Sequence, residues 1–122
     1  MTKVRRFYNN RNMEIREAVQ RLGALAHETR LSVFRLLVRR GHAGLAAGEI
    51  ASRMEISPPN ASFHLAELSR VGLIAARREG RSVIYSVDFL SIAGLVDYMR
   101  ENCCAEEPPQ LVPLNSITRR KK

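Results

Sequence analysis

Two adjacent cysteines, Cys103 and Cys104, carry the most reactive side chains of the chain, and the sequence contains no other cysteine. Sulfur ligands select soft metal ions, and the polar residues before the pair indicate an exposed position. A disulfide between neighbouring cysteines needs a strained backbone, so a redox-active disulfide is a less favoured role than ion binding. A third interpretation is that neither cysteine binds an ion. The pair is therefore a candidate site for a soft ion.

Basic side chains indicate a second kind of chemistry. The 122 residues include 20 Lys and Arg against 12 Asp and Glu, which gives a formal net charge of +8. Such a surplus favours a polyanionic partner. Most of it, however, lies in residues 1–12 (+4) and 105–122 (+2), where a basic segment can simply aid solubility. Charge alone therefore leaves nucleic-acid binding open.

The sequence offers no evident catalytic arrangement. It has no Walker loop and no GxSxG, HExxH or CxxC pattern. His42 and His64 have no evident nucleophilic partner, and His27 is expected to cap or pack near the second helix. No apolar run reaches the roughly 18–20 residues of a membrane span, and no secretory signal is evident. We therefore expect a non-enzymatic protein in the reducing cytoplasm, without a membrane partner.

The spacing of apolar residues predicts the elements that position these side chains. Apolar residues at steps of three and four favour helices, whereas alternation around Gly80 favours a β-hairpin over residues 73–87. Ser57 suits a helix N-cap, and Pro58 suits the first helical position, where a missing N–H costs nothing. The expected helices cover about 13–25, 27–41, 47–54, 58–70 and 88–102.

This order of elements is typical of a winged helix-turn-helix. A short helix joined through residues 55–57 to a proline-started helix forms the helix-turn-helix, and the basic hairpin that follows forms the wing. The expected fold is mainly α with a β-hairpin wing. We assign residues 13–104 to this DNA-binding and dimerisation domain, residues 1–12 to a disordered basic arm and residues 105–122 to a flexible tail.

Three motifs resemble the ArsR family of bacterial metal- and metalloid-responsive repressors. They are LGALAHETRLSVFRLL at 22–37, the Ser-x-His-Leu segment at 62–65 and REGRSVIYSV at 78–87. The resemblance covers residues 14–104 and is specific as a set. It implies a winged-helix homodimer that binds an inverted-repeat operator in double-stranded DNA and releases it when an inducer binds.

The segment that begins at Ser57 is expected to enter the major groove, because the first part of a recognition helix reaches the base edges. Asn60 can read adenine, and Ser62 can donate to a base or a phosphate. Contact with a thymine methyl would explain an exposed Phe63; alternatively, Phe63 packs on the domain's own surface. His64 matches the family histidine at the DNA face, with a structural hydrogen bond as the alternative. The expected DNA contacts of this segment are Ser57, Pro59, Asn60, Ser62, Phe63 and His64.

The hairpin has three arginines around Gly80. A basic wing can place arginine near the minor groove or its phosphates. Alternation puts Arg77 and Arg78 on opposite faces, and we expect Arg78 and Arg81 to contact DNA. Glu79 opposes a phosphate contact unless it turns away. The alternative is a hairpin tip that contacts only solvent.

Apolar stripes on the first and last helices exceed what a small winged domain buries alone. We expect these helices to form the interface of a two-fold homodimer; the alternative is that the stripes close the core of the monomer. A two-fold dimer sets its half-sites near one helical turn, about 34–36 Å apart. The stripes comprise Ile15, Val19 and Leu22 and Phe89, Ile92, Val96 and Met99.

The family resemblance also narrows the inducer. Arsenic sensors of the helix-three type carry cysteines in the third helix, and this chain has none there. Zinc sensors of the last-helix type use Asp, His, His and Glu, whereas Asp88 is followed here by Leu90 at the histidine position. The chain instead resembles members that bind arsenite through a cysteine pair at the end of the last helix. The resemblance thus implies As(III) or Sb(III) at Cys103 and Cys104, with no constitutive cofactor.

Trivalent arsenic prefers three sulfurs, but no third cysteine follows the pair. A third ligand from the other subunit or solvent, or a monosubstituted organoarsenical, would resolve this difference. The sequence thus predicts a metalloid-responsive repressor. A redox-responsive or constitutive winged-helix regulator, and a winged-helix module that binds proteins, are the alternatives.

Overall fold

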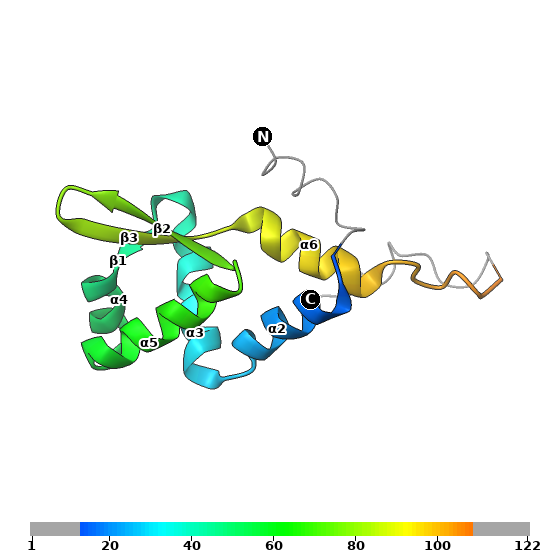
Figure 1. Cartoon of the computed structure of the whole chain (residues 1–122), viewed down its shortest axis with the longest axis horizontal. Helices are drawn as coiled ribbons and strands as arrows, with labels where there is room; N and C mark the ends of the chain where they lie inside the picture. The colour runs from blue at the N-terminus through cyan, green and yellow to red at the C-terminus, as the bar shows by residue number, and fades with distance from the viewer. Residues whose placement is uncertain (1–12, 109–122) are drawn as a thin grey trace.

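A computed structural model describes residues 13–108, so the expected basic arm and most of the expected tail lie outside the described residues. The predicted winged helix-turn-helix is confirmed (Figure 1). Within the described range, the elements are α2 (Ile15–Leu25), α3 (Glu28–Arg40), the 3-10 helix η2 (Gly41–Ala43), β1 (Leu45–Ala46), α4 (Ala47–Met54), α5 (Pro58–Arg70), β2 (Ile74–Glu79), β3 (Ser82–Val87) and α6 (Phe89–Arg100).

Side-chain caps define where α3, α5 and α6 begin. The Ser57 hydroxyl accepts a hydrogen bond from the Asn60 N–H at 3.2 Å, and two prolines occupy the first turn of α5. The Asp88 carboxylate caps α6 in the same way, accepting from the Ser91 N–H at 3.2 Å. His27 caps α3 through Nδ1, which accepts from the Arg30 N–H at 3.3 Å. These caps confirm the predicted starts of all three helices.

The sheet has one strand more than the predicted hairpin. β2 and β3 pair antiparallel around Gly80, and the two-residue strand β1 pairs with the other edge of β3. This additional strand, Leu45–Ala46, lies between two predicted helices, where the sequence predicts no strand. Gly44 has a φ of 68° and lies so close to Tyr85 that a side chain would collide with the Tyr85 backbone. Glycine at this position allows β1 to approach β3.

The core lies between α3, α4, α5 and the base of the sheet. Leu37, Ile50, Leu65, Leu68 and Leu73 are almost completely inaccessible to solvent. These residues belong to α3, to the two helices of the helix-turn-helix (α4 and α5) and to the position directly before β2. This shared core fixes the orientation of α5 relative to the wing.

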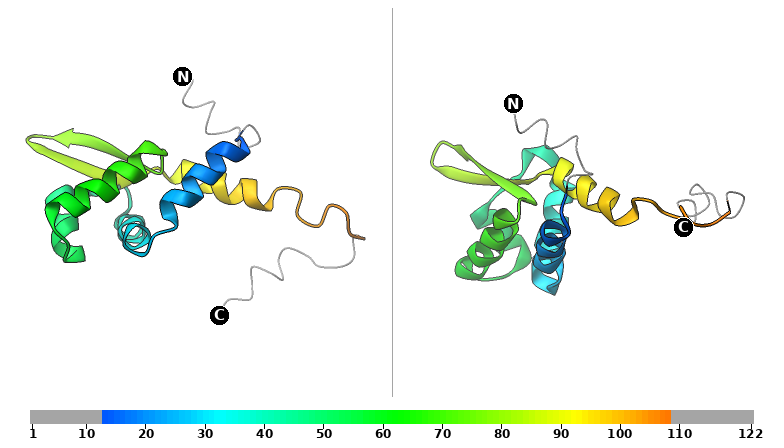
Figure 2. Two further views of the ribbon diagram at one scale, coloured as in Figure 1. Left: turned by 60° about the horizontal axis from the view of Figure 1, so that its bottom comes forward. Right: turned by 45° about the vertical axis from the view of Figure 1, so that its right-hand side comes forward.

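Helix α6 leads away from the sheet on the side opposite the wing tip and lies beside α2 (Figures 1 and 2). It ends at Arg100, two residues before the expected end at Asn102, and Glu101 already has an extended backbone. Among residues 13–108, no helix has the length and apolar character that crossing a membrane requires.

Candidate DNA interface and cysteine site

A three-residue turn joins α4 to α5. Glu55 ends α4 in the left-handed conformation (φ 58°), and its N–H points back to the carbonyls of Ala51 and Ser52. The Ile56 N–H donates to the Ala51 carbonyl at 3.1 Å. This reversal sets Ser57 at the start of α5, with the first turn of the helix facing solvent.

The first half of α5 presents an exposed surface. Phe63 keeps 57% of its surface exposed and touches His64 only edge to face, with ring centroids 5.4 Å apart. Its ring is therefore available to a partner, because little of it packs on the domain. The predicted contact residues that are exposed here are Ser57, Pro59, Asn60, Ser62 and Phe63.

His64 does not belong to this surface, and the prediction that it faces outward is wrong. It is 6% exposed, and its Nδ1 lies 3.3 Å from Arg30 Nη1. Its ring centroid is 4.9 Å from that of His27. Burial lowers the pKa of His64, and the neighbouring His27 and Arg30 lower it further. For His64 the structure instead shows the alternative interpretation, a structural hydrogen bond, with Arg30 as the partner.

The helical spacing of α5 contains the signal for this burial. Ala61, His64, Leu65 and Leu68 recur at the steps of a single buried stripe, and all four are buried. A histidine on such a stripe needs an internal partner. Arg30 of α3 supplies it, and sequence reasoning missed Arg30 because the two residues lie 34 positions apart.

The wing separates its arginines into two kinds. Arg77 donates to the His42 carbonyl at 3.2 Å, to the Ala43 carbonyl at 2.9 Å and to the Glu79 carboxylate at 2.8 Å. Arg78 and Arg81 are exposed, and neither has a side-chain partner within residues 13–108. These are the two arginines that the sequence analysis predicts to contact DNA.

Apolar side chains remain exposed on α2 and α6. Val19 is 59% exposed and Met99 54%. Phe89 and Ile92 are instead half-buried and pack against the core, as the alternative of a stripe that closes the core of the monomer expects for these two residues. The first turn of α6 follows β3 directly and therefore lies over the core. The exposed apolar residues of the two helices are Ile15, Val19, Leu22, Leu90, Val96 and Met99.

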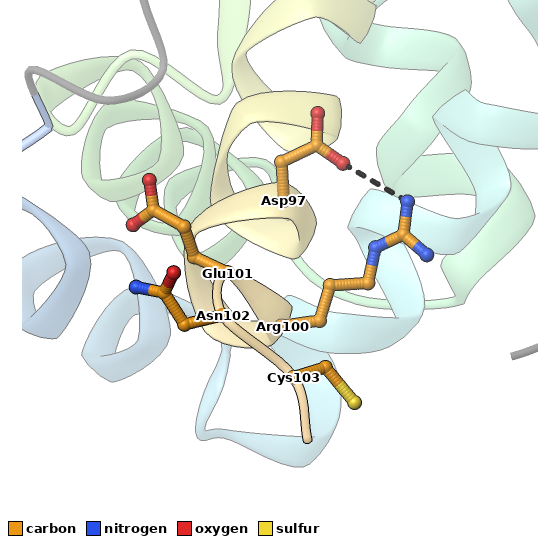
Figure 3. Close-up of a pocket in the computed structure, with 5 residues that line it drawn as sticks. All are labelled: Asp97, Arg100, Glu101, Asn102 and Cys103. Carbon is orange, nitrogen blue, oxygen red and sulfur yellow. Dashed lines mark ion pairs between the residues drawn. The ribbon is translucent and has the colours of Figure 1, made fainter. Parts of the chain in front are cut away.

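The two cysteines follow α6 in a series of turns. Asn102 and Cys104 have left-handed backbones (φ 63° and 60°), and the Cys103 N–H donates to the Arg100 carbonyl at 3.0 Å. Both cysteines are exposed, and their sulfurs lie 3.5 Å apart. An open pocket beside the pair is lined by Asp97, Arg100, Glu101, Asn102 and Cys103, and an Arg100–Asp97 ion pair of 3.5 Å spans it (Figure 3).

The thiols of the pair influence one another. Their hydrogen bond raises the pKa of Cys104, and the charge of Cys103 raises it further. Because the thiolate is the nucleophile and the metal ligand, Cys104 is less reactive at neutral pH than a free cysteine. Residues 13–108 contain no cluster of three or more His, Cys, Asp or Glu side chains suited to a metal ion, so the pair has no third ligand of these types there.

Comparisons with known proteins connect this geometry to gene regulation. A family model for a helix-turn-helix domain matches residues 25–77. The transcriptional activator HlyU of Vibrio cholerae is 33% identical over 88 residues, which cover 72% of this chain and 79% of HlyU. A solved structure of that protein has a TM-score of 0.60 at 31% identity and covers 76% of this chain and 98% of HlyU.

Two further relatives bear on assembly and sensing. The homodimeric winged helix-turn-helix DNA-binding domain of Mb0332 from Mycobacterium bovis, a possible ArsR-family regulator, has a TM-score of 0.58 at 26% identity. It covers 76% of this chain, which in turn spans 86% of that domain. The arsenic resistance regulator ArsR1 of Pseudomonas putida is 38% identical over 61 residues, or 50% of this chain and 46% of ArsR1.

Proposed function

Because this chain belongs to the ArsR family of winged helix-turn-helix transcriptional regulators, it is a DNA-binding regulator, and we propose that it is a homodimeric repressor induced by trivalent arsenic or antimony. In this proposal, two copies of α5 bind an inverted-repeat operator. The inducer binds Cys103 and Cys104 and releases the DNA.

The exposed surface of α5 supports the DNA side of the proposal. Asn60 and Ser62 offer hydrogen bonds to base edges or phosphates, and Phe63 offers an apolar surface to a thymine methyl. Arg78 and Arg81 leave their guanidinium groups free for phosphates beside the groove. Polar and apolar base contacts together with phosphate contacts are what sequence-specific binding requires.

The exposed faces of α2 and α6 support the homodimer. Ile15, Val19 and Leu22 recur at steps of four and three along α2, and Val96 and Met99 lie three residues apart on the neighbouring α6. Exposed apolar residues that share a helix face in this way mark an interaction surface. A second copy of the same surface is a suitable partner because two-fold interfaces are self-complementary. The homodimeric state of the Mb0332 domain agrees with this arrangement.

The sulfur separation at the end of α6 carries the proposal for the inducer. A thiolate lies about 2.3 Å from a bound zinc ion, so two sulfurs that share a centre of similar size lie roughly 3.3–3.8 Å apart. The observed 3.5 Å falls within this range without movement of the backbone. Two As–S bonds replace two As–OH bonds of arsenous acid, and each thiol proton leaves with a hydroxide as water.

The position of the pair suggests how binding reaches the DNA. Cys103 and Cys104 lie three and four residues after the end of α6, which carries half of the proposed dimer face. An inducer releases DNA only if it favours a dimer geometry that fits the operator less well. A changed end of α6 can alter the angle between the two copies, and with it the distance between the two α5 helices.

An electrophoretic mobility shift with DNA from upstream of the protein's own coding sequence tests the proposal. We expect the wild-type protein to shift this DNA and As(III) to abolish the shift. The Cys103→Ser, Cys104→Ser double variant should bind DNA equally well and should not respond to As(III). Ser91→Ala, elsewhere on α6, serves as the matched control and should respond normally. Release of DNA from the double variant by As(III) would contradict the assigned site.

A redox-responsive regulator is the second candidate, since two exposed thiols 3.5 Å apart can also be oxidised. Titration of the DNA complex with hydrogen peroxide and, separately, with As(III) distinguishes the candidates. Release by peroxide alone favours the redox regulator. Release by As(III) under reducing conditions favours the metalloid sensor.

A further inference from the structure

The three arginines of the wing do not have equivalent environments. All three nitrogens of the Arg77 guanidinium donate hydrogen bonds: Nε to the Glu79 carboxylate, Nη1 to the His42 carbonyl and Nη2 to the Ala43 carbonyl. Glu79 also neutralises the charge of Arg77 at 2.8 Å. Three of the five N–H groups of this guanidinium are thus engaged and its charge is paired, which weakens its attraction for a phosphate although its side chain is 43% exposed.

The acceptors of Arg77 belong to the turn η2, which is itself held in place. Arg40 Nε donates to the Gly44 carbonyl at 2.8 Å, and the Gly44 N–H donates to the Gly41 carbonyl at 3.2 Å. The turn also lies against β3, where Gly44 approaches the Tyr85 backbone. Arg77 therefore attaches the middle of β2 to a rigid part of the domain.

The same turn contacts the start of α6. The ring of His42 packs edge to face on Phe89, with centroids 5.3 Å apart and planes at 71°. Phe89 is the first residue of α6 and packs against the core. The Gly41–Ala43 turn thus contacts the wing through the carbonyls of His42 and Ala43. Through the His42 ring it also contacts α6, the helix that precedes the cysteine pair.

We propose that Arg77 is a positioning residue, which fixes the angle of the wing by holding it on the Gly41–Ala43 turn and, through His42, on the first turn of α6. This inference rests on the proposed function in one respect, namely that the wing contacts DNA. Arg77 then affects DNA binding without touching DNA. Its planar guanidinium holds two nitrogens against two carbonyls in a fixed geometry, which the single nitrogen of a lysine ammonium group does not reproduce.

The salt dependence of DNA binding separates positioning from phosphate contact. Each neutralised phosphate contributes about one unit to the slope of log K against log salt concentration. For the upstream duplex, we expect Arg77→Lys and Arg77→Ala to weaken binding by a similar factor, roughly 3- to 10-fold, with an unchanged slope. Arg78→Ala, the neighbouring control, should lower the slope by about one. A reduced slope in Arg77→Ala, with Arg77→Lys like the wild type, would overturn the proposal.

Hydrogen exchange of the DNA-free protein tests the anchor independently of DNA binding, so a failure of the proposed function does not affect this result. We expect the β2 and β3 amides to exchange roughly 3- to 10-fold faster in Arg77→Lys, and at the wild-type rate in Arg78→Ala. His42→Ala keeps the carbonyl but loses the ring contact with Phe89 and should also speed exchange in the wing. Unchanged exchange in Arg77→Lys refutes the anchor, and unchanged exchange in His42→Ala refutes the link to α6.

Discussion

Arg30 connects α5 to α2 and α3 through its hydrogen bonds. Its guanidinium contacts His64 Nδ1 at 3.3 Å and the Ala24 carbonyl at the end of α2, while its backbone N–H donates to His27. His64 Nδ1 accepts from Arg30 only when it carries no proton. The contact therefore requires the neutral form of His64. Burial lowers the pKa of this residue most, and the charges of His27 and Arg30 lower it further, so all three favour that neutral form.

Acidification should therefore destabilise the fold through His64. Its pKa is lower in the folded state than in the unfolded chain, where it is near 6.5, so the unfolded state binds the proton more readily. The stabilising contribution is complete above about pH 6.5 and is lost as the pH falls through the folded pKa. Chemical denaturation at several pH values measures this, and His64→Gln should flatten the dependence between pH 7 and 5. The exposed control Ser62→Ala should keep the wild-type slope; an equal slope in His64→Gln contradicts the assignment.

The cysteine pair gives a second prediction at the residue scale. Because the hydrogen bond with Cys103 raises the pKa of Cys104, Cys103→Ala should increase the thiolate fraction of Cys104 at pH 7.5. Iodoacetamide should then modify Cys104 faster in Cys103→Ala than in the wild type, as followed by peptide mass spectrometry. Glu107→Gln should have a smaller effect in the same direction. A slower reaction in Cys103→Ala would contradict the account of the pair.

At the scale of elements, α5 and the wing each combine a buried side with a free side. Leu65 and Leu68 fix α5 in the core, while Phe63 on the opposite side stays exposed. In the wing, the Arg77 side chain is hydrogen-bonded, while the exposed Arg78 side chain has no partner within residues 13–108. Rigid elements of this kind hold their exposed side chains in defined positions, as recognition of base edges requires.

Phe63 should contribute specificity through thymine methyl groups. Replacing a contacted thymine by deoxyuridine removes one methyl group, which corresponds to about 0.8 kcal/mol of apolar burial, or roughly fourfold in affinity. We expect this loss for the wild-type protein at one thymine of each half-site, and no loss for Phe63→Ala. Fluorescence anisotropy with substituted duplexes measures both. The same loss in both proteins would show that Phe63 reads no methyl group.

Local signals explain which elements could be predicted. The cap at Ser57, the prolines after it and the turn at Gly80 act within a few residues, and they predict α5 and the hairpin correctly. The strand β1 has two residues, too few for any alternation to be visible. Its pairing with β3 depends on residues about 40 positions away, which local periodicity does not report.

The errors at the candidate site have a related cause. For His64, the resemblance to the DNA-facing histidine of a family outweighed the helical spacing, which places it on the buried stripe. Its partner Arg30 lies 34 positions away in sequence, and the two carbonyls that accept from Arg77 lie 35 and 34 positions away from it. Such pairings follow from the packing of the whole domain and have no signal in a short sequence window.

At the scale of the whole molecule, the elements proposed to contact DNA and the helices α2 and α6, which have exposed apolar residues, lie on different parts of the domain (Figure 2). The wing and α5 form one end, and α6 with α2 extends toward the other. A dimer formed through α2 and α6 therefore leaves both recognition helices free. Since α6 also leads to the cysteine pair, the proposed sensing site and the proposed dimer interface involve the same helix.

The dimer prediction belongs to this scale. A charge at Val19, 59% exposed on α2, should disfavour burial of this face against a second copy. We expect the wild type to be dimeric and Val19→Glu to be monomeric in light scattering after size exclusion, with unchanged helix content by circular dichroism. Val38→Glu, on the exposed side of α3, is the matched control and should remain dimeric. A dimeric Val19→Glu would show that α2 lies outside the interface.

Footprinting of the DNA upstream of the protein's own coding sequence tests the central claim most directly. Two copies of α5 related by two-fold symmetry should protect two half-sites of opposite orientation, centred about one helical turn, or 34–36 Å, apart. Asn60→Ala should remove both protected regions together. A single unpaired protected region, or protection that Asn60→Ala leaves intact, would contradict DNA reading by a symmetric pair of recognition helices.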